Sequence, residues 1–346
     1  MAGETENSAT RHLVIAACLI ILAAGLKVAG DLITPLLISL FFSVLCIPPM
    51  QRLKRHGVPD GVAIAIVVLG ASLAVIGISM IIGGSLAGFK DKAPEYIASL
   101  DGHLEGSLSW LQSQGIDVKS EDLTKKMSSS AIFDFIAELM AKLSSALSGL
   151  MLVVLTMIFM LVEASTFPSK LRWALGHPES DLKSWGDAME KVQKYVAIKA
   201  GVSLVTALLA TILTAALGID FPLLWGLVAF LFNFIPNIGS VIAAGPPVLL
   251  ALVQYGSGSA ILVGIGYFAI NMVMGNIVEP RLMGQRLGLS TLVVFLSLVF
   301  WNWIWGPVGM VLSVPLTVIV KIILEHSAQF KGVAILLGSE TSPPTA

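Results

Sequence analysis

The chain has 346 residues, of which 56% are hydrophobic and only 12% are charged. A soluble globular domain carries about 25% charged residues, so this composition excludes an ordinary soluble protein and indicates an integral membrane protein. The 21 basic and 22 acidic residues nearly balance, which excludes the strong positive charge of a nucleic-acid-binding protein.

Long, continuous apolar runs predict an all-α polytopic membrane protein, because the strands of a membrane β-barrel would alternate apolar and polar residues. We expect about six full transmembrane helices. In chain order they cover residues 13–29, 32–48, 62–88, 147–162, 197–217 and 257–278.

Two further apolar stretches are broken in the middle by proline and glycine. Residues 221–255, here called hairpin A, contain Pro236-Asn237-Ile238-Gly239, and residues 290–324, here called hairpin B, contain Trp305-Gly306-Pro307. Each arm has about 15 residues, which at 1.5 Å per residue crosses a hydrocarbon core of about 30 Å poorly. The sequence therefore predicts two helical hairpins, and it leaves open whether they span the membrane or re-enter it.

The basic residues predict the orientation of the chain. Arg52, Lys54 and Arg55 follow the second span, and positive loops face the cytoplasm, so we expect a cytoplasmic N-terminus. The later basic loops predict a cytoplasmic C-terminus as well. In this orientation hairpin A enters from outside and hairpin B from inside, which makes them an inverted pair.

These predictions divide the chain into five parts. They are three N-terminal transmembrane helices (1–88), an extracytoplasmic segment of short amphipathic helices (89–145), the fourth span with a cytoplasmic amphipathic helix capped by Ser180 (146–200), a transport core with both hairpins (201–325) and a cytoplasmic tail (326–346).

The two hairpins resemble each other in sequence. Phe232-Asn233-Phe234-Ile235 in hairpin A corresponds to Trp301-Asn302-Trp303-Ile304 in hairpin B, and each motif is followed by a glycine and then a proline. Broken helices in corresponding positions of two inverted halves point to a transporter's substrate site. The alternative is that the asparagines only hold helices together.

The motifs of enzymes and cofactor sites are missing from the sequence. No Gly-rich loop ending in Lys-Ser/Thr is present, the five histidines lie outside the spans or at their edges, and two cysteines form no metal-binding set. We therefore expect no enzyme activity, no ATP hydrolysis, no cofactor and no metal. The polar groups within the spans are mostly amides beside aromatic rings, which fit a small neutral solute. The candidate pathway residues are Asn233, Pro236, Asn237, Gly239, Asn271, Asn276, Trp301, Asn302 and Trp303.

Ionisable residues in or beside the spans are few, and they are functional candidates by default. They are Lys27, Asp31, Glu163, Lys199, Glu279, Arg281 and Lys321. We single out Glu279 and Arg281, where the sixth span is expected to end, as a proton-coupling pair. The alternative is an interfacial carboxylate paired with Arg281.

The hairpin A turn Pro236-Asn237-Ile238-Gly239-Ser240 and the segment 275–284, Gly-Asn-Ile-Val-Glu-Pro-Arg-Leu-Met-Gly, resemble the signature of the autoinducer-2 exporter family. The runs 287–297 and 306–310 continue the match, and Gly115-Ile116-Asp117-Val118 extends it to the outer segment. Within the family, the chain is most similar to members that transport the quorum-sensing signal in Gram-negative bacteria.

This resemblance implies a permease of the bacterial inner membrane that exports autoinducer-2, a small neutral signal. It also implies a homo-oligomer, with a pentamer favoured, and it supplies no catalytic residues. Because other relatives are assigned sodium/proton antiport, a cation/proton antiporter remains an alternative, as does an oligomeric membrane channel or scaffold.

Overall fold

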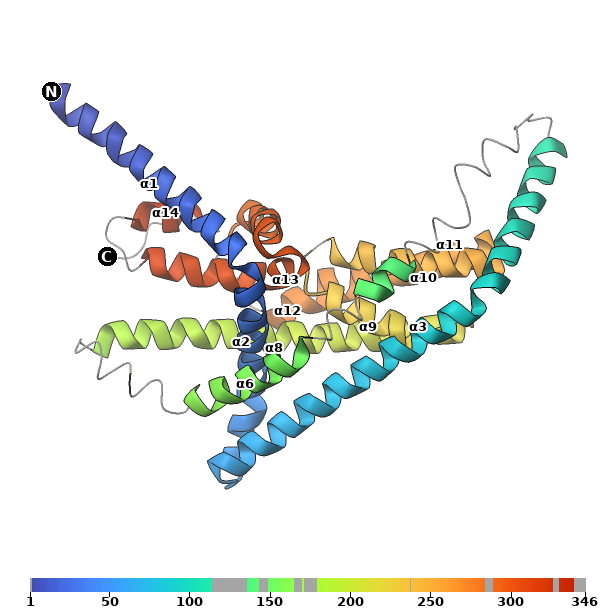
Figure 1. Ribbon diagram of the computed structural model, residues 1–346, viewed down its shortest axis with the longest axis horizontal. Helices are drawn as coiled ribbons and strands as arrows, with labels where there is room; N and C mark the ends of the chain where they lie inside the picture. Colours follow the sequence, from blue (N-terminus) through green and yellow to red (C-terminus); the bar gives the residue numbers. More distant parts are fainter. Residues whose placement is uncertain are drawn as a thin grey trace. The chain divides into compact units, whose positions relative to one another are not determined.

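In the computed structural model, every regular element in the described part of the chain is a helix (Figure 1). The described residues are 2–113, 136–142, 149–164, 170, 179–236, 238–283, 289–325 and 330–338. The expected fold class, an all-α polytopic membrane protein, is confirmed. Five helical segments are long and apolar enough to cross a membrane: Gly30–Arg55, Asp60–Ser99, Met189–Ala216, Ser257–Leu282 and Thr291–Glu325.

The chain forms two compact units, and each unit contains one of the two hairpins. Unit 1 consists of Met1–Asp60, Leu152–Lys194 and Gln285–Ala346 and includes hairpin B. Unit 2 consists of Gly61–Met151 and Tyr195–Gly284 and includes hairpin A.

Unit 1 is built around α13 (Thr291–Glu325), which packs against α1 (Ala2–Val28) and α2 (Gly30–Arg55). The first two helices are separated only at Ala29, close to the break expected at Gly30-Asp31. The short helices α6 (Leu150–Ala164) and α14 (Lys331–Leu336) and the helical residues 179–194 also belong to the unit.

The expected break in hairpin B is present inside α13. Trp305 (φ −126°, ψ 19°) and Gly306 (φ 59°, ψ −144°) leave the helical conformation and divide α13 into two arms. Glycine is required at the second position because a residue with a Cβ rarely adopts this positive φ.

In unit 2, hairpin A consists of α9 (Pro222–Phe232) and α10 (Gly239–Tyr255), with the expected break between them. Gly256 (φ 83°) then reverses the chain into α11 (Ser257–Val273), which lies beside α10. The core of the unit surrounds Trp225, whose side chain is fully buried.

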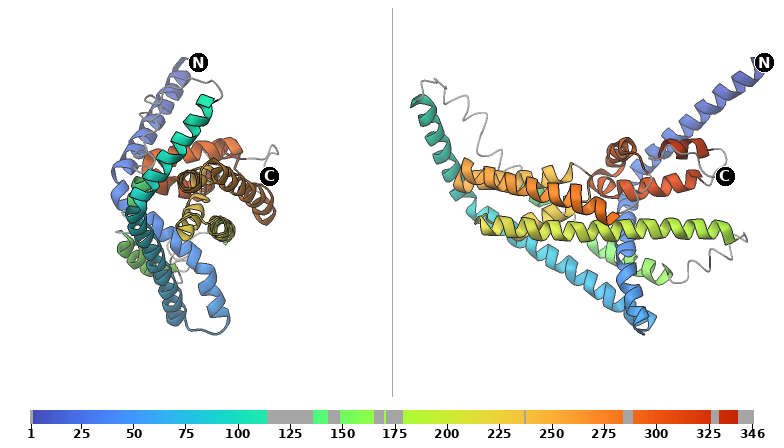
Figure 2. Two further views of the ribbon diagram at one scale, coloured as in Figure 1. Left: turned by 90° about the vertical axis from the view of Figure 1, so that its right-hand side faces the viewer. Right: turned by 180° about the vertical axis from the view of Figure 1, so that it is seen from behind.

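Three expected helix boundaries were wrong. The third span continues as one helix, α3 (Asp60–Ser113), so the first amphipathic helix of the outer segment is not separate. The cytoplasmic amphipathic helix and the fifth span likewise form one helix, α8 (Glu179–Ala216), in which Ser180 lies inside the helix rather than at its cap. The long, unbroken courses of α3 and α8 are clear in Figure 2.

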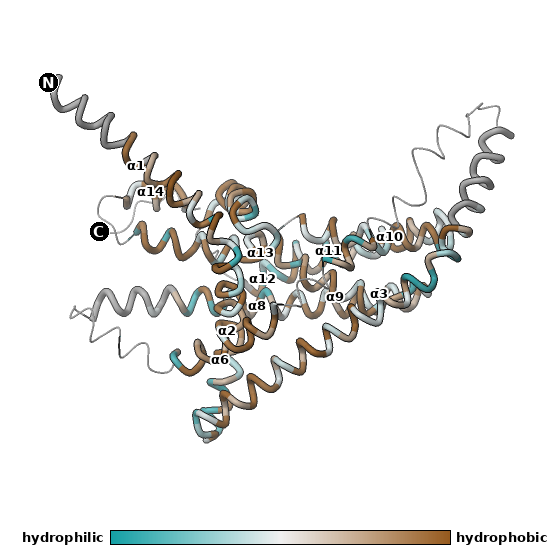
Figure 3. The backbone as a smooth tube through the Cα atoms, viewed as in Figure 1, coloured by the Kyte–Doolittle hydropathy of each residue, from teal (hydrophilic) through white to brown (hydrophobic). Residues whose placement is uncertain are grey.

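The third wrong boundary is at the sixth span, where the helix does not end before Glu279. A π-helix, η1 (Met274–Val278), leads directly into α12 (Glu279–Met283). The errors share one cause, since a change from apolar to polar composition does not end a helix whose backbone hydrogen bonds continue. Figure 3 shows this along α3, where hydrophobic colouring gives way to hydrophilic colouring without a break.

The structure describes only part of the expected outer segment (89–145) and of the expected tail (326–346). Residues 136–142 are helical, and Ile136 and Met140 are buried in the core of unit 2. The motif at 115–118 and the tail beyond residue 338 lie outside the described residues.

Candidate functional site

The turn of hairpin A is held against α8 by an amide. Asn233, at the end of α9, is only 8% exposed, and its Nδ2 donates a hydrogen bond to the Ser203 hydroxyl at 2.8 Å. The return arm starts at Gly239, where an added Cβ would overlap the carbonyl oxygen of Phe232. The turn is therefore both tight and polar.

Hairpin B repeats this construction. A Cβ on Gly309 would overlap the carbonyl oxygen of Trp301, so in both hairpins a glycine lies on the carbonyl of the aromatic residue before the asparagine. The Trp301 indole donates a hydrogen bond to the Thr317 hydroxyl at 3.0 Å, which joins the two arms. The sequence similarity of the hairpins thus corresponds to a shared local geometry.

The turn of hairpin B is also fixed to α1 by aromatic side chains. The Trp305 ring stacks on Trp301 with centroids 5.0 Å apart, and its Nε1 donates to the carbonyl oxygen of Leu26 at 3.0 Å. Trp303 is half exposed, and the Lys27 ammonium lies 4.2 Å from its ring centroid. Asn302 between them is partly buried.

One face of α8 presents polar groups to the interior of unit 2. Lys199, Ser203 and Thr206 are all buried and recur at helical spacing. Hairpin A packs close to this helix, because a Cβ on Gly226 of α9 would collide with the Thr211 hydroxyl and lie 2.8 Å from the Ala207 carbonyl oxygen.

Glu279 forms an ion pair with this polar face. The Lys199 Nζ lies 2.6 Å from Oε1 and 2.8 Å from Oε2, and the two side chains are only 5% and 17% exposed. The alternative of a pair between Glu279 and Arg281 is wrong: the carboxylate is bonded to α8, while the Arg281 side chain is exposed. Lys199 and Glu279 were both among the ionisable candidates from the sequence, but their ion pair was not predicted.

The other candidate pathway residues of unit 2 differ in position and in burial. Pro236 is partly buried in the turn of hairpin A, and Asn271 is partly buried in α11. Asn276 lies in η1 and is exposed, and Asn237 lies outside the described residues. The structure therefore brings Asn233, Pro236 and Gly239 together at one turn, and Glu279 of α12 contacts Lys199, which lies one turn of α8 from Ser203.

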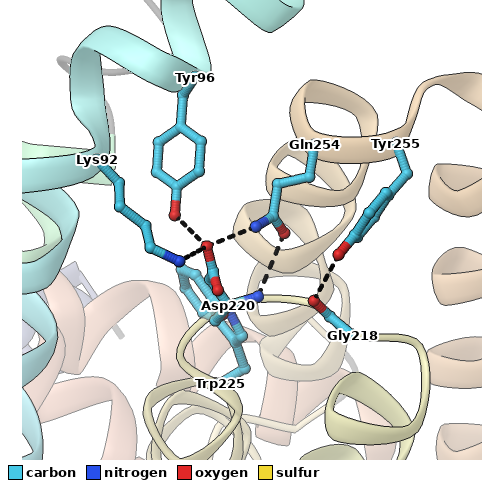
Figure 4. Close-up of polar contacts among 7 residues, drawn as sticks. All are labelled: Lys92, Tyr96, Gly218, Asp220, Trp225, Gln254 and Tyr255. Atoms are coloured by element: carbon cyan, nitrogen blue, oxygen red, sulfur yellow. Dashed lines mark hydrogen bonds and ion pairs between the residues drawn. The ribbon is translucent and has the colours of Figure 1, made fainter.

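A second polar cluster, which sequence reasoning missed, lies at the base of hairpin A (Figure 4). The Oδ2 atom of Asp220 accepts hydrogen bonds from Lys92 Nζ at 2.7 Å, Tyr96 Oη at 2.6 Å and Gln254 Nε2 at 2.6 Å. Its backbone carbonyl accepts one from the indole of Trp225 at 2.7 Å. Asp220 thereby joins α3 to both ends of the hairpin.

A signal for this cluster was present in the sequence. Asp220 is an isolated acid between two apolar helices, in Gly218-Ile219-Asp220-Phe221-Pro222, and Gln254 is a polar residue at the opposite end of the same hairpin. Since the two arms of a hairpin are antiparallel, their distant ends meet. Lys92 and Tyr96 could not be added, because they were assigned to a separate outer segment.

Comparison with known proteins agrees with this architecture. The sequence model of the AI-2E family transporter matches residues 16–329. The AI-2 transport protein TqsA of Escherichia coli (strain K12) is 41% identical over 319 residues, which cover 92% of this chain and 93% of that protein. The putative transport protein YhhT of the same organism is 38% identical over 335 residues, 97% of this chain and 96% of that protein. A putative transport protein of Mycobacterium tuberculosis, MT0215, is 25% identical over 340 residues, with 91% and 88% covered. A family match over most of the chain and these full-length similarities show that the chain is a multi-pass membrane protein of the AI-2E family of transporters.

Proposed function

We propose that the protein exports autoinducer-2, a small neutral quorum-sensing signal, across the bacterial inner membrane without hydrolysing ATP. The observation that carries the proposal is the repeated hairpin turn, with its asparagine, its close glycine and its flanking aromatic rings. Irregular backbone at membrane depth is tolerated only where protein buries it or a hydrated cavity lies beside it. Membership of the family and the name of the TqsA relative support the substrate.

The chemistry of the hairpin A turn fits such a substrate. The Asn233 amide and the Ser203 hydroxyl offer donors and acceptors without net charge, as a hydroxyl-rich neutral solute requires. We place both termini in the cytoplasm on the strength of the basic loops, with the two hairpins inverted. We further propose a homo-oligomer, a pentamer by resemblance to the family.

The test is flux of autoinducer-2 in proteoliposomes of the purified protein, with and without an imposed proton gradient. Flux above that of protein-free liposomes is expected. A gradient that increases the flux would identify a coupled exporter, whereas indifference to the gradient would identify a facilitator. Absence of flux under both conditions would overturn the proposal.

A cation/proton antiporter is the second candidate, and the buried pair of Lys199 and Glu279 favours it. An antiporter needs an ionisable group at depth, and this pair lies on helices long enough to span the membrane. Cation exchange in the same vesicles should then depend on pH and be lost in Glu279→Gln. Glu163→Gln is the matched control, because Glu163 is half exposed and paired with Lys170. Cation exchange that persists unchanged in Glu279→Gln would remove this candidate.

A further inference from the structure

We propose that the Glu279 carboxylate is a binding site for one monovalent cation, and that the Lys199 ammonium is a built-in cation that fills this site in the conformation seen here. The inference rests on the transport function proposed above, and it names the group through which an ion gradient would act on hairpin A.

At Glu279, both oxygens of one carboxylate contact a single positively charged group. Both oxygens approach the same Lys199 Nζ, at 2.6 and 2.8 Å. A sodium or lithium ion held by both oxygens would need the position that the ammonium now holds, and a proton on either oxygen would remove the negative charge that binds the ammonium. Lys199 and an incoming cation therefore compete for one place.

The single negative charge of Glu279 can balance only one of the two cations at a time. The two side chains are 5% and 17% exposed, and an unpaired charge in such a buried position is strongly unfavourable. If a second cation joined Glu279 while Lys199 stayed, the site would hold one uncompensated positive charge. Entry of a cation thus requires Lys199 to withdraw towards water, which its flexible four-carbon stem permits.

The surroundings of the pair link it to the transport route. Lys199 lies one turn of α8 from Ser203, which accepts the hydrogen bond of Asn233 at the hairpin A turn. Glu279 directly follows the π-helix η1, and π-helical turns frequently occur at functional sites. Two further titratable groups are close by: the Tyr195 phenol, one turn before Lys199 and within electrostatic reach of Glu279, and the exposed Arg281.

The competing explanation is a permanent ion pair that only stabilises the packing of α8 on α12. The two explanations differ in whether the Glu279 carboxylate ever becomes free. A hydrophobic carbodiimide such as dicyclohexylcarbodiimide modifies a carboxyl group in apolar surroundings when that group is protonated, and a bound cation protects it.

The experiment measures carbodiimide modification of Glu279 by mass spectrometry of the purified full-length protein. It compares mildly alkaline with mildly acidic pH, and sodium or lithium chloride with N-methylglucamine chloride. The variants are Lys199→Met and, as matched control, Lys194→Met, because Lys194 is exposed on the same helix.

We expect modification to be at least about tenfold faster in Lys199→Met than in the wild type, since the carboxyl group loses the ammonium that both its oxygens contact. Lys194→Met should match the wild type. Protection of Lys199→Met by sodium or lithium would identify an alkali cation as the ligand. Modification that becomes faster at acidic pH but is not slowed by sodium or lithium would identify the proton as the ligand.

Modification that is unaffected by the Lys199 substitution, by pH and by salt would overturn the proposal. If Lys199→Met does not purify as a monodisperse protein, the wild type decides: modification that rises on acidification supports an exchangeable site, and its absence at both pH values contradicts one. The readout needs no autoinducer-2, so failure of the transport assay and failure of this inference are separate results.

Discussion

The indole Nε1 of Trp305 donates a hydrogen bond to the carbonyl oxygen of Leu26 at 3.0 Å, which places the turn of hairpin B beside the last turn of α1. The apolar part of α1, Leu13–Val28, is about 24 Å long, and residues 291–304, the first arm of hairpin B, measure about 21 Å. The chain bends at Ala29, and α2 then continues for about 39 Å, enough to cross the hydrocarbon core. The turn of hairpin B therefore lies beside the junction of α1 and α2.

This contact predicts that the hairpin B turn and the junction of α1 and α2 are accessible from the same side of the membrane. In a protein with Cys18 and Cys46 replaced by serine, cysteines introduced as Asp31→Cys and Pro307→Cys should react with a membrane-impermeant maleimide from the same side. The orientation proposed above makes this the extracytoplasmic side of intact cells. Reaction of Asp31→Cys alone would show that hairpin B stops within the membrane.

Alanine at the two close-approach glycines should destabilise both hairpins to a similar degree. In Gly239→Ala and Gly309→Ala the added Cβ would overlap a backbone carbonyl, and such overpacking costs about 1–3 kcal/mol. The thermal unfolding midpoint of the purified protein should therefore fall in both variants. Gly245→Ala is the control, because an added Cβ there meets no atom within 4 Å. A midpoint as high in the two variants as in this control would contradict the tight-turn geometry.

The Asp220 cluster predicts unequal effects of its two charged members. Asp220→Ala should lower the free energy of unfolding by about 2–4 kcal/mol, because the Tyr96 hydroxyl and the Gln254 amide lose a shared acceptor. Lys92→Met should cost less than about 1 kcal/mol, since the ion pair is partly exposed. Denaturant or thermal unfolding of the two variants gives this order directly, and equal losses would mean that the ion pair dominates.

The repeated asparagines predict a loss of transport without a loss of folding. Asn233→Leu and Asn302→Leu should each reduce autoinducer-2 flux by about three- to tenfold, the effect of one lost hydrogen bond of about 1 kcal/mol, while the amount of protein in the membrane stays unchanged. Gln51→Leu removes an exposed amide and should leave the flux as in the wild type. Unchanged flux in both asparagine variants would assign the hairpin turns a purely structural role.

Much of the fold could be predicted from the apolar composition of the chain and from the positions of its prolines and glycines. The lengths of the apolar runs located four of the six expected spans, whereas the runs 13–29 and 147–162 form shorter apolar helices, Leu13–Val28 and Leu150–Ala164. Pro236, Gly239, Gly306 and Pro307 marked the turns of both hairpins. These signals are local, because proline and glycine act on the backbone at or beside their own positions. The extents of α3 and α8 could not be read in the same way, since polar residues after an apolar run continue a helix as readily as they end it.

The site was harder to predict because its contacts join distant parts of the chain. Lys199 and Glu279 are 80 positions apart, and Asp220 and Lys92 are 128 apart. Sequence proximity favoured Arg281 as the partner of Glu279, but the direction of the side chain on its helix decides the contact, and that direction appears only once α8 and α12 are packed together.

The 54-residue helix α3 has a mechanical consequence. Its contacts with the core of unit 2 lie between Ile78 and Tyr96, where the Asp220 cluster also holds it. About 27 Å of helix precede this region and about 26 Å follow it. α3 therefore extends beyond the contact region by nearly equal lengths at its two ends. A rotation of α3 by about 10° about the middle of this region would shift each end, about 40 Å away, by about 7 Å in opposite directions, so that a displacement of one end of the helix is accompanied by an opposite displacement of the other.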